Sequence, residues 1–176
     1  MTTAPEFSRK VRIDTLGTQP RQIEIGAGQE ERSALARRFG IVEIERLSAQ
    51  AALTRSGDHV IAAGTLAARV TQSCVATGEP VEEIVDEEFR IEFRPQPSPT
   101  SEEEEVELSA AELDIVFYDG GAVDIGEAVA ETLSLSLDPY PRAPDAQEAL
   151  REAGVKSEGE AGAFGALAAL RDKLKP

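Results

Sequence analysis

The sequence predicts an α+β fold, with a mainly antiparallel sheet or a partly open barrel, a short early helix and C-terminal helices. Residues 41–55 and 59–73 are rich in Val, Ile, Ala and Thr and alternate with period two. A Ser-Gly-Asp turn at residues 56–58 separates them, which is typical of a β-hairpin. The segment after Asp124 has helical spacing instead. The 176 residues suit one domain with a proper core.

The first forty residues predict two short strands and a helix. Residues 8–14 and 21–25 alternate in polarity, and we expect them to pair with each other. Residues 29–39 place apolar side chains four positions apart among charged ones. This spacing predicts a short surface helix that ends at Gly40.

The middle of the chain predicts a charged strand, an acidic loop and a last strand. Residues 81–94 alternate, and their C-terminal half places apolar side chains opposite charged ones, as in a strand with one solvated face. Residues 95–107 form a proline and glutamate tract that cannot bury much of itself, which predicts a solvated loop. Residues 113–118 predict the final strand.

A capped helix is predicted in residues 123–142, VDIGEAVAETLSLSLDPYPR. Asp124 stands at the N-cap position and Glu127 follows three residues later, so the pair can form a reciprocal capping box. Apolar residues then recur at helical spacing. Pro139 and Pro141 end the helix because proline cannot donate a backbone hydrogen bond and restricts the residue before it.

We expect a single α+β domain over residues 1–144, with the acidic loop at 95–107 inside it. Residues 145–162 are small, charged and interrupted by glycine, which suits a linker or a weak helix. Residues 163–176 predict a C-terminal amphipathic helix. Such a helix docks either on the protein's own sheet or in a groove of a partner.

The charge of the chain is unevenly distributed. The formal net charge is −15, and residues 79–107 hold two Lys/Arg against twelve Asp/Glu. An acidic surface repels the phosphate backbone of nucleic acids and attracts basic proteins. The alternative is that the acidic excess confers solubility alone.

The sequence shows no catalytic constellation. Cys74 and His59 would have to form a nucleophilic pair, and nothing identifies a third group to orient them. One Cys and one His cannot build a zinc site of Cys and His ligands. We therefore expect no enzyme, no cofactor and no metal. Because no secretory signal or membrane-length apolar run is present, we also expect a cytoplasmic protein without membrane contact.

Two blocks, TQSCVATGEPVEEIVDEEFRIEFRP (71–95) and DIGEAVAETLSLSLDPYPRAP (124–144), resemble the YceD-type family of large ribosomal RNA subunit accumulation proteins. The resemblance implies a cytoplasmic, non-enzymatic protein needed for accumulation or processing of large-subunit ribosomal RNA. Some members carry C-x-x-C where this chain has a single cysteine, so we interpret that cysteine as a turn or core residue. The matched positions imply structural or interfacial roles for Cys74, Gly78, Glu79, Pro80, Asp124, Glu127, Asp138, Pro139 and Pro141.

Two functions stay open. In the first, an assembly factor binds a basic ribosomal protein, a processing partner or a pre-ribosomal particle; its candidate contact residues are Glu82, Glu88, Glu92, Glu102, Glu103, Glu104, Glu105, Phe164, Leu167 and Leu170. In the second, the chain binds RNA directly; its candidates are the basic residues Arg9, Lys10, Arg12, Arg37 and Arg38. Six Phe, two Tyr and no Trp offer few platforms for base stacking, which favours the first. A metal-dependent hydrolase is a third hypothesis that no residue spacing supports.

Overall fold

The computed structural model describes residues 5–97 and 114–155 of the chain. The predicted C-terminal helix at 163–176 and most of the predicted acidic loop at 95–107 lie outside these described residues. The described residues form strands, helices and the turns between them.

The chain forms two compact units. The main unit consists of residues 1–72 and 82–139, and the second unit consists of residues 73–81 and 140–176. The main unit holds most of the strands and the two longer helices, α1 and α2. Its elements, with those that continue into the second unit, are β1 (Lys10–Arg12), a 3-10 turn (Ile13–Thr15), β2 (Arg21–Gly26), α1 (Gln29–Phe39), β3 (Glu43–Ser56), β4 (His59–Ser73), β5 (Pro80–Pro95), β6 (Asp114–Tyr118), β7 (Ala122–Asp124) and α2 (Ile125–Ser136).

The main sheet has the strand order β2-β3-β4-β5-β6. β3 pairs antiparallel with both β2 and β4, and the predicted hairpin is confirmed, because Ser56 lies opposite His59 across a tight turn. Gly57 in that turn has φ +61°, the left-handed conformation that glycine adopts without strain. The α+β class with an antiparallel-dominated sheet is confirmed. Residues 5–97 and 114–155 contain no closed barrel, because β2 and β6 are the edges of the five-stranded sheet.

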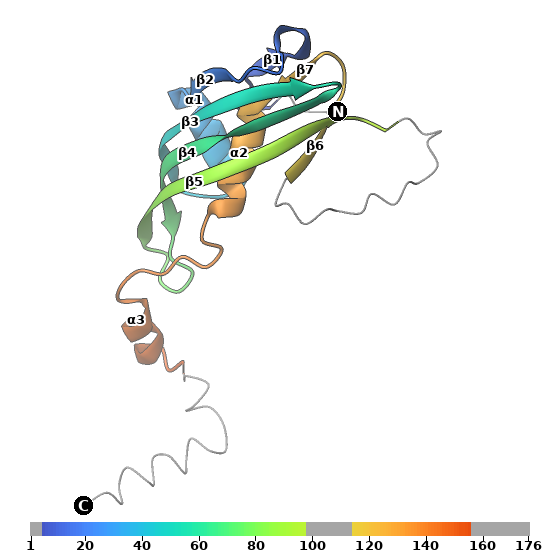
Figure 1. The fold of residues 1–176 in the computed structure, drawn as a ribbon. Coiled ribbons are helices and arrows are strands. Elements are labelled where there is room, and N and C mark those ends of the chain that lie inside the picture. The colour runs from blue at the N-terminus through green and yellow to red at the C-terminus, as the bar shows by residue number, and fades with distance from the viewer. Residues whose placement is uncertain (1–4, 98–113, 156–176) are drawn as a thin grey trace, which may run out of the picture. The chain divides into compact units, whose positions relative to one another are not determined.

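β6 is an exception to the antiparallel pattern. It lies at the edge of the sheet and pairs parallel with β5, with Ile91 opposite Asp114 and Phe93 opposite Val116 (Figure 1). Strand spacing in the sequence does not reveal direction, because a parallel and an antiparallel edge strand can carry the same apolar alternation.

The expected pairing of the first two strands is wrong. β1 pairs antiparallel with β7, with Lys10 opposite Asp124, and β2 pairs with β3 instead. The two short strands β1 and β7 form a separate small sheet. The reason lies in the polar contacts of Ser8 and Arg9 with the start of α2, described below, which hold β1 against β7.

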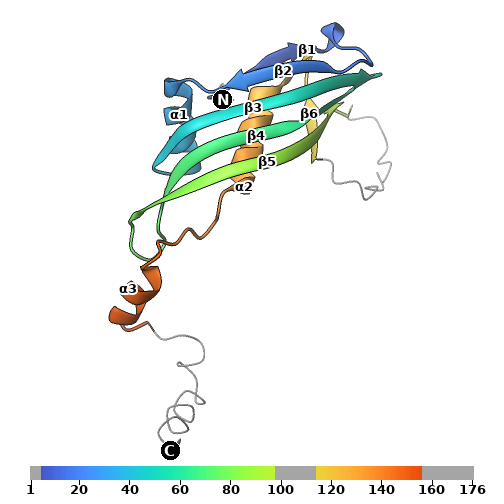
Figure 2. The same cartoon turned by 60° about the vertical axis from the view of Figure 1, so that its left-hand side comes forward.

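The core lies between the main sheet and its two helices. α2 runs across one face of the sheet, and the core also includes the buried side of α1 (Figures 1 and 2). Its apolar cluster consists of side chains removed from water on folding, and the buried polar side chains Gln72 and Glu92 have hydrogen-bond partners that are described below. Its most deeply buried side chains include Phe7, Leu35, Leu53, Val60, Leu66, Phe93, Val129 and Leu133. Despite these apolar faces, no helix in the described parts of the chain is long and apolar enough to cross a bilayer.

The second unit contains the turn between β4 and β5 and the helix α3 (Ala146–Glu152). A small apolar cluster of Cys74, Ala143 and Ala146 holds the turn to the segment before α3. The backbone N–H of Val75 also donates to the Pro141 carbonyl at 2.9 Å. The turn and the segment after α2 are therefore joined by both apolar and backbone contacts.

Substitution of Gly126 by alanine is expected to destabilise the main unit. A Cβ at this position would lie 2.4 Å from the carbonyl oxygen of Phe7 and 2.8 Å from the backbone nitrogen of Arg9, so the backbone must shift. We expect Gly126→Ala to lower the free energy of unfolding by about 1–3 kcal/mol, measured by urea denaturation. Gly121→Ala is the matched control, because a Cβ there meets nothing within 4 Å. Equal stability of the two variants would contradict the close passage of the N-terminal segment over α2.

Candidate functional site

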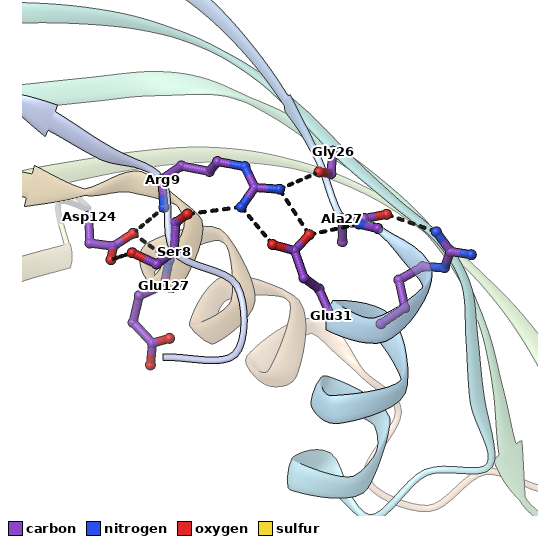
Figure 3. A network of polar contacts seen from close by, with 9 residues as sticks. Ser8, Arg9, Gly26, Ala27, Glu31, Asp124 and Glu127 are labelled. Carbon is purple, nitrogen blue, oxygen red and sulfur yellow. Dashed lines mark hydrogen bonds and ion pairs between the residues drawn. The ribbon is translucent and has the colours of Figure 1, made fainter. Parts of the chain in front are cut away.

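Asp124 joins the N-terminal segment to the start of α2 (Figure 3). Its carboxylate accepts a hydrogen bond from Ser8 Oγ, one from the backbone N–H of Arg9 at 2.8 Å and one from the backbone N–H of Glu127 at 3.3 Å. The predicted N-cap is therefore confirmed. The reciprocal hydrogen bond of the predicted capping box, to the Glu127 carboxylate, does not form. That carboxylate pairs instead with Arg38 of α1 at 2.7 Å.

Arg9, a candidate for RNA binding, makes a two-pronged pair with Glu31 at the start of α1 (Figure 3). Its Nη1 and Nη2 donate to the Glu31 carboxylate at 2.7 and 2.9 Å, and they also reach the carbonyls of Ser8 and Gly26. The hydrogen bond from Arg9 is the main reason that the pKa of Glu31 is lowered. The Glu31 carboxylate also accepts the Gly28 backbone N–H at 2.7 Å, so it caps α1 as well.

Arg38, a second candidate for RNA binding, lies between two carboxylates. Its guanidinium is 2.7 Å from Glu127 Oε1 and 3.0 Å from Glu6 Oε2. The hydrogen bond to Glu127 is the largest cause that raises the pKa of Arg38. The Arg38 guanidinium therefore joins α1, α2 and the N-terminal segment. A phosphate group would have to displace both carboxylates to bind this guanidinium.

The remaining basic candidates differ in their surroundings. Arg12 pairs with Asp14 two residues away on an exposed surface. Lys10 and Arg37 are exposed and have no ion-pair partner within the described residues. Of the five basic candidates, Arg9, Arg12 and Arg38 are thus paired with the chain's own carboxylates, and Lys10 and Arg37 are open.

The outer side of β5 carries exposed acidic residues. Glu82, Asp86 and Glu88 are exposed and alternate with the buried residues Val85 and Phe89. We call Glu82, Asp86 and Glu88 the acidic face of β5. None of its three carboxylates has a hydrogen bond or ion pair within residues 5–97 and 114–155. Between them stands Ile84, with 66% of its surface exposed, so the acidic face also offers an apolar contact.

Glu92 lies on the same strand but is not exposed, so the expectation that it is solvated is wrong, and its role as a partner contact stays a prediction. It is 8% exposed, and its carboxylate lies 2.8 Å from both Arg94 Nη2 and His59 Nδ1. The hydrogen bond from Arg94, followed by that from His59, lowers the pKa of Glu92 against the effect of burial. A carboxylate in such surroundings stays charged because its hydrogen-bond partners, Arg94 first, replace water.

The remaining acidic and C-terminal candidates, Glu102, Glu103, Glu104, Glu105, Phe164, Leu167 and Leu170, lie outside the described residues. Their role as partner contacts stays a prediction. The candidate partner contacts that lie among the described residues are therefore those on β5.

A buried amide that the sequence did not suggest lies beside β5. Gln72 is buried, and its Nε2 donates to Glu83 Oε2 at 2.8 Å and to the Asp138 carbonyl at 3.1 Å. The Glu83 carboxylate in turn accepts the backbone N–H of Asp138 at 3.2 Å. These bonds hold the chain just after α2 against the sheet. Polarity alone predicts an exposed glutamine here, but the period-two alternation of β4 places Gln72 on the buried face with Leu66 and Val70, which was the signal for its burial.

The cysteine-bearing turn of the second unit is held by its own backbone. The Cys74 N–H donates to the Glu79 carbonyl at 2.7 Å, and the Gly78 N–H donates to the Cys74 carbonyl at 2.8 Å. Gly78 has φ +76°, which favours glycine. The buried Cys74 Sγ accepts the Ala143 N–H at 3.3 Å, the largest cause that lowers the pKa of this thiol to about 7.

The proline positions of the matched blocks lie at element ends. Pro80 begins β5, and Pro139 follows the end of α2 by three residues. Pro141 is buried, and its carbonyl accepts the backbone N–H of Val75. These residues shape the backbone and present no reactive group. Within residues 5–97 and 114–155, no group of three His, Cys, Asp or Glu side chains is placed to hold a metal ion.

Together these features define a small acidic α+β protein with an open sheet and an internally paired cationic N-terminal segment. Residues 62–171, more than half of the chain, match the family described as large ribosomal RNA subunit accumulation protein YceD, and the chain belongs to this family. No curated protein and no solved structure matches the chain. The family description connects the chain with accumulation of large-subunit ribosomal RNA and does not describe an enzyme.

Replacement of Glu92 by glutamine is expected to destabilise the fold near neutral pH. Because the pKa of Glu92 is lowered on folding, its charge stabilises the native state above the unfolded value of 4.5, and this contribution is lost as pH falls through the folded value. We expect Glu92→Gln to cost about 1–3 kcal/mol at pH 7, since Arg94 loses its counter-charge. The cost is expected to shrink as the solution is made acidic.

Urea denaturation between pH 7 and pH 3 measures this effect. Glu88→Gln is the matched control, because Glu88 lies on the same strand and is exposed. A Glu92→Gln penalty that stays constant across this pH range would contradict a stabilising charge at Glu92.

Proposed function

We propose that the chain is a non-enzymatic cytoplasmic assembly factor that binds a basic ribosomal protein or another basic processing partner. Through this binding it supports accumulation of large-subunit ribosomal RNA, the role for which its family is named. The observation that carries the proposal is the acidic face of β5, whose exposed carboxylates have no partner in the described parts of the chain.

Charge complementarity gives the physical basis. A ribosomal protein outside the ribosome exposes cations that the RNA phosphates would otherwise neutralise. The carboxylates of Glu82, Asp86 and Glu88 can pair with such cations, and the chain's net charge of −15 speeds the encounter at low salt. The exposed Ile84 in the same row supplies an apolar contact that salt does not screen. The complex is therefore expected to weaken, and not to vanish, as salt rises.

The cation pairs support a protein partner over direct RNA binding. Phosphate binding depends on Lys and Arg side chains that are free to displace counterions. Arg9 and Arg38 instead hold carboxylates of their own chain at 2.7–3.0 Å, and these contacts join the N-terminal segment to α1 and α2. Of the basic candidates, only Lys10 and Arg37 are exposed without an ion-pair partner in the described parts of the chain, a small cationic footprint for RNA.

Removal of the acidic charges is expected to weaken partner binding. The probe is the total protein of the large ribosomal subunit, stripped of RNA, captured on the immobilised full-length chain and identified by mass spectrometry. We expect basic subunit proteins to bind, and the triple variant Glu82→Gln, Asp86→Asn, Glu88→Gln to bind them about 3- to 100-fold more weakly, from about 0.2–1 kcal/mol for each exposed pair.

A matched triple variant, Glu30→Gln, Glu43→Gln and Glu148→Gln, removes the same charge from exposed positions elsewhere. If both triple variants lose the same amount of binding, net charge alone explains the effect. That result would contradict a role for the acidic face of β5. Purified ribosomal RNA is the second probe. If it binds at physiological salt, and the double variant Lys10→Glu, Arg37→Glu abolishes that binding, direct RNA binding is favoured instead.

A further inference from the structure

The edge of the main sheet at β6 lacks a neighbouring strand. β6 pairs with β5 on one side, and no other described strand lies beside it (Figures 1 and 2). A groove with a volume of about 1160 Å³ runs beside β6, and Val116, Phe117 and Tyr118 all line it. Successive residues of a strand point to opposite faces, so three in a row line one groove where it opens along the edge of the strand. The edge of β6 is therefore uncovered by the described parts of the chain.

The backbone of β6 offers hydrogen-bonding groups at this edge. The Tyr118 carbonyl accepts the Gln96 N–H at 3.1 Å, so the backbone groups of Tyr118 point toward β5. Because backbone groups alternate in direction along a strand, those of Ile115 and Phe117 point away from β5. Among residues 5–97 and 114–155, neither of these two residues has a backbone hydrogen bond to a segment outside the sheet. Their N–H and C=O groups are therefore open to another strand.

The side chains of Ile115 and Phe117 are apolar and lie on the outer face of the sheet, away from the core. Across the parallel pair, Phe117 lies opposite Arg94, and Ile115 lies opposite Glu92. Phe117 is 57% exposed and Ile115 is half-buried. A large exposed aromatic side chain at a free edge is a surface that a neighbouring strand would bury.

The two edges of the main sheet differ in how they are protected. β2, at the other edge, carries the exposed charged residues Arg21 and Glu24. Charged side chains of this kind keep edge strands from pairing with other chains. Residues 115–118 of β6 include no charged residue and no proline. The edge at β6 is therefore suited to pairing, and the edge at β2 is not.

We propose that β6 pairs antiparallel with β6 of a second copy of this chain, about a two-fold axis at Val116. In this register, Ile115 of each copy lies opposite Phe117 of the other. The backbone groups at the free edge of one copy then meet the same groups of the second copy, and the apolar side chains pack against each other. An aromatic residue opposite a β-branched residue is a favourable cross-strand pair. A second copy fits this edge because the two-fold axis exchanges the two positions and makes the strand complementary to itself.

The interface is short, so the dimer is expected to be weak. β6 has five residues, which gives a contact smaller than a standard interface, and we expect a Kd on the order of 10–100 µM. Each copy has a net charge of −15, so two copies repel each other. Salt screens this repulsion and leaves apolar contacts unscreened. Dimerisation is therefore expected to strengthen as salt rises, whereas binding of a basic partner weakens.

Sedimentation velocity of the purified full-length chain over a range of concentrations measures the dimer. Phe117→Thr is expected to raise the Kd about 2- to 30-fold, because each dimer loses two cross-strand pairs. Ile84→Thr is the matched control, since Ile84 is 66% exposed on β5 and precedes the part of β5 that pairs with β6. The urea midpoint of the monomer is expected to change little in either variant, because both side chains are exposed.

A cysteine at the two-fold axis tests the register. Opposite residues of a non-hydrogen-bonded antiparallel pair have Cα atoms about 4.5 Å apart, within the range of about 4.4–6.8 Å that a disulfide spans. Val116→Cys is therefore expected to form a covalent dimer on mild oxidation with diamide, and Ile84→Cys is not. The unsubstituted chain is the blank, because its own cysteine, Cys74, is buried.

Other outcomes contradict the proposal. A chain that stays monomeric at about 1 mM does not pair through β6. A dimer that Phe117→Thr and Ile84→Thr weaken equally, or that Val116→Cys does not link, uses another surface or another register. A monomer whose Ile115 and Phe117 amides are protected from hydrogen exchange has this edge covered by another part of its own chain. None of these results bears on the binding of a basic partner, so the proposed function is tested separately.

Discussion

The hydrogen bonds of Asp124 determine how the N-terminal segment is placed. One carboxylate caps α2 and also accepts hydrogen bonds from Ser8 and Arg9, so the N-terminal segment must cross the start of the helix. Gly126 leaves room for that crossing because it has no Cβ. With the segment in place, β1 pairs with β7, and the Arg9 guanidinium is brought to Glu31 at the start of α1. A single N-cap thus connects both helices to the first strand.

This arrangement separates the charges of the chain into two sets. Arg9 and Arg38 are used within the fold, where charge-assisted hydrogen bonds to carboxylates join distant elements. Within residues 5–97 and 114–155, Glu82, Asp86 and Glu88 on the outer side of β5 stay exposed and have no hydrogen bond or ion pair. The charges that hold the fold together are therefore distinct from the carboxylates that the proposed function assigns to a partner.

Local patterns in the sequence predicted the hairpin of β3 and β4, the N-cap of α2 and the buried apolar positions Phe89, Ile91 and Phe93 in the C-terminal half of β5, because neighbouring residues decide these features. They failed where the partner is far away in the sequence. Glu127 pairs with Arg38, which lies 89 residues earlier, and Glu92 is buried against His59 across 33 residues. A glutamate at an alternating position predicts a solvated face unless tertiary structure brings cations to it. The parallel direction of β6 could not be predicted from the sequence either, because its partner strand is set by tertiary structure.

Affinity capture from a lysate of the source cells, with and without nuclease, distinguishes a basic protein partner from RNA. Captured proteins are quantified by mass spectrometry at low and at physiological salt. We expect a basic protein of the large subunit to stay bound in stoichiometric amount after the RNA has been digested. Complete loss of every ribosomal protein on nuclease treatment, with intact ribosomal RNA retained in its absence, would contradict it.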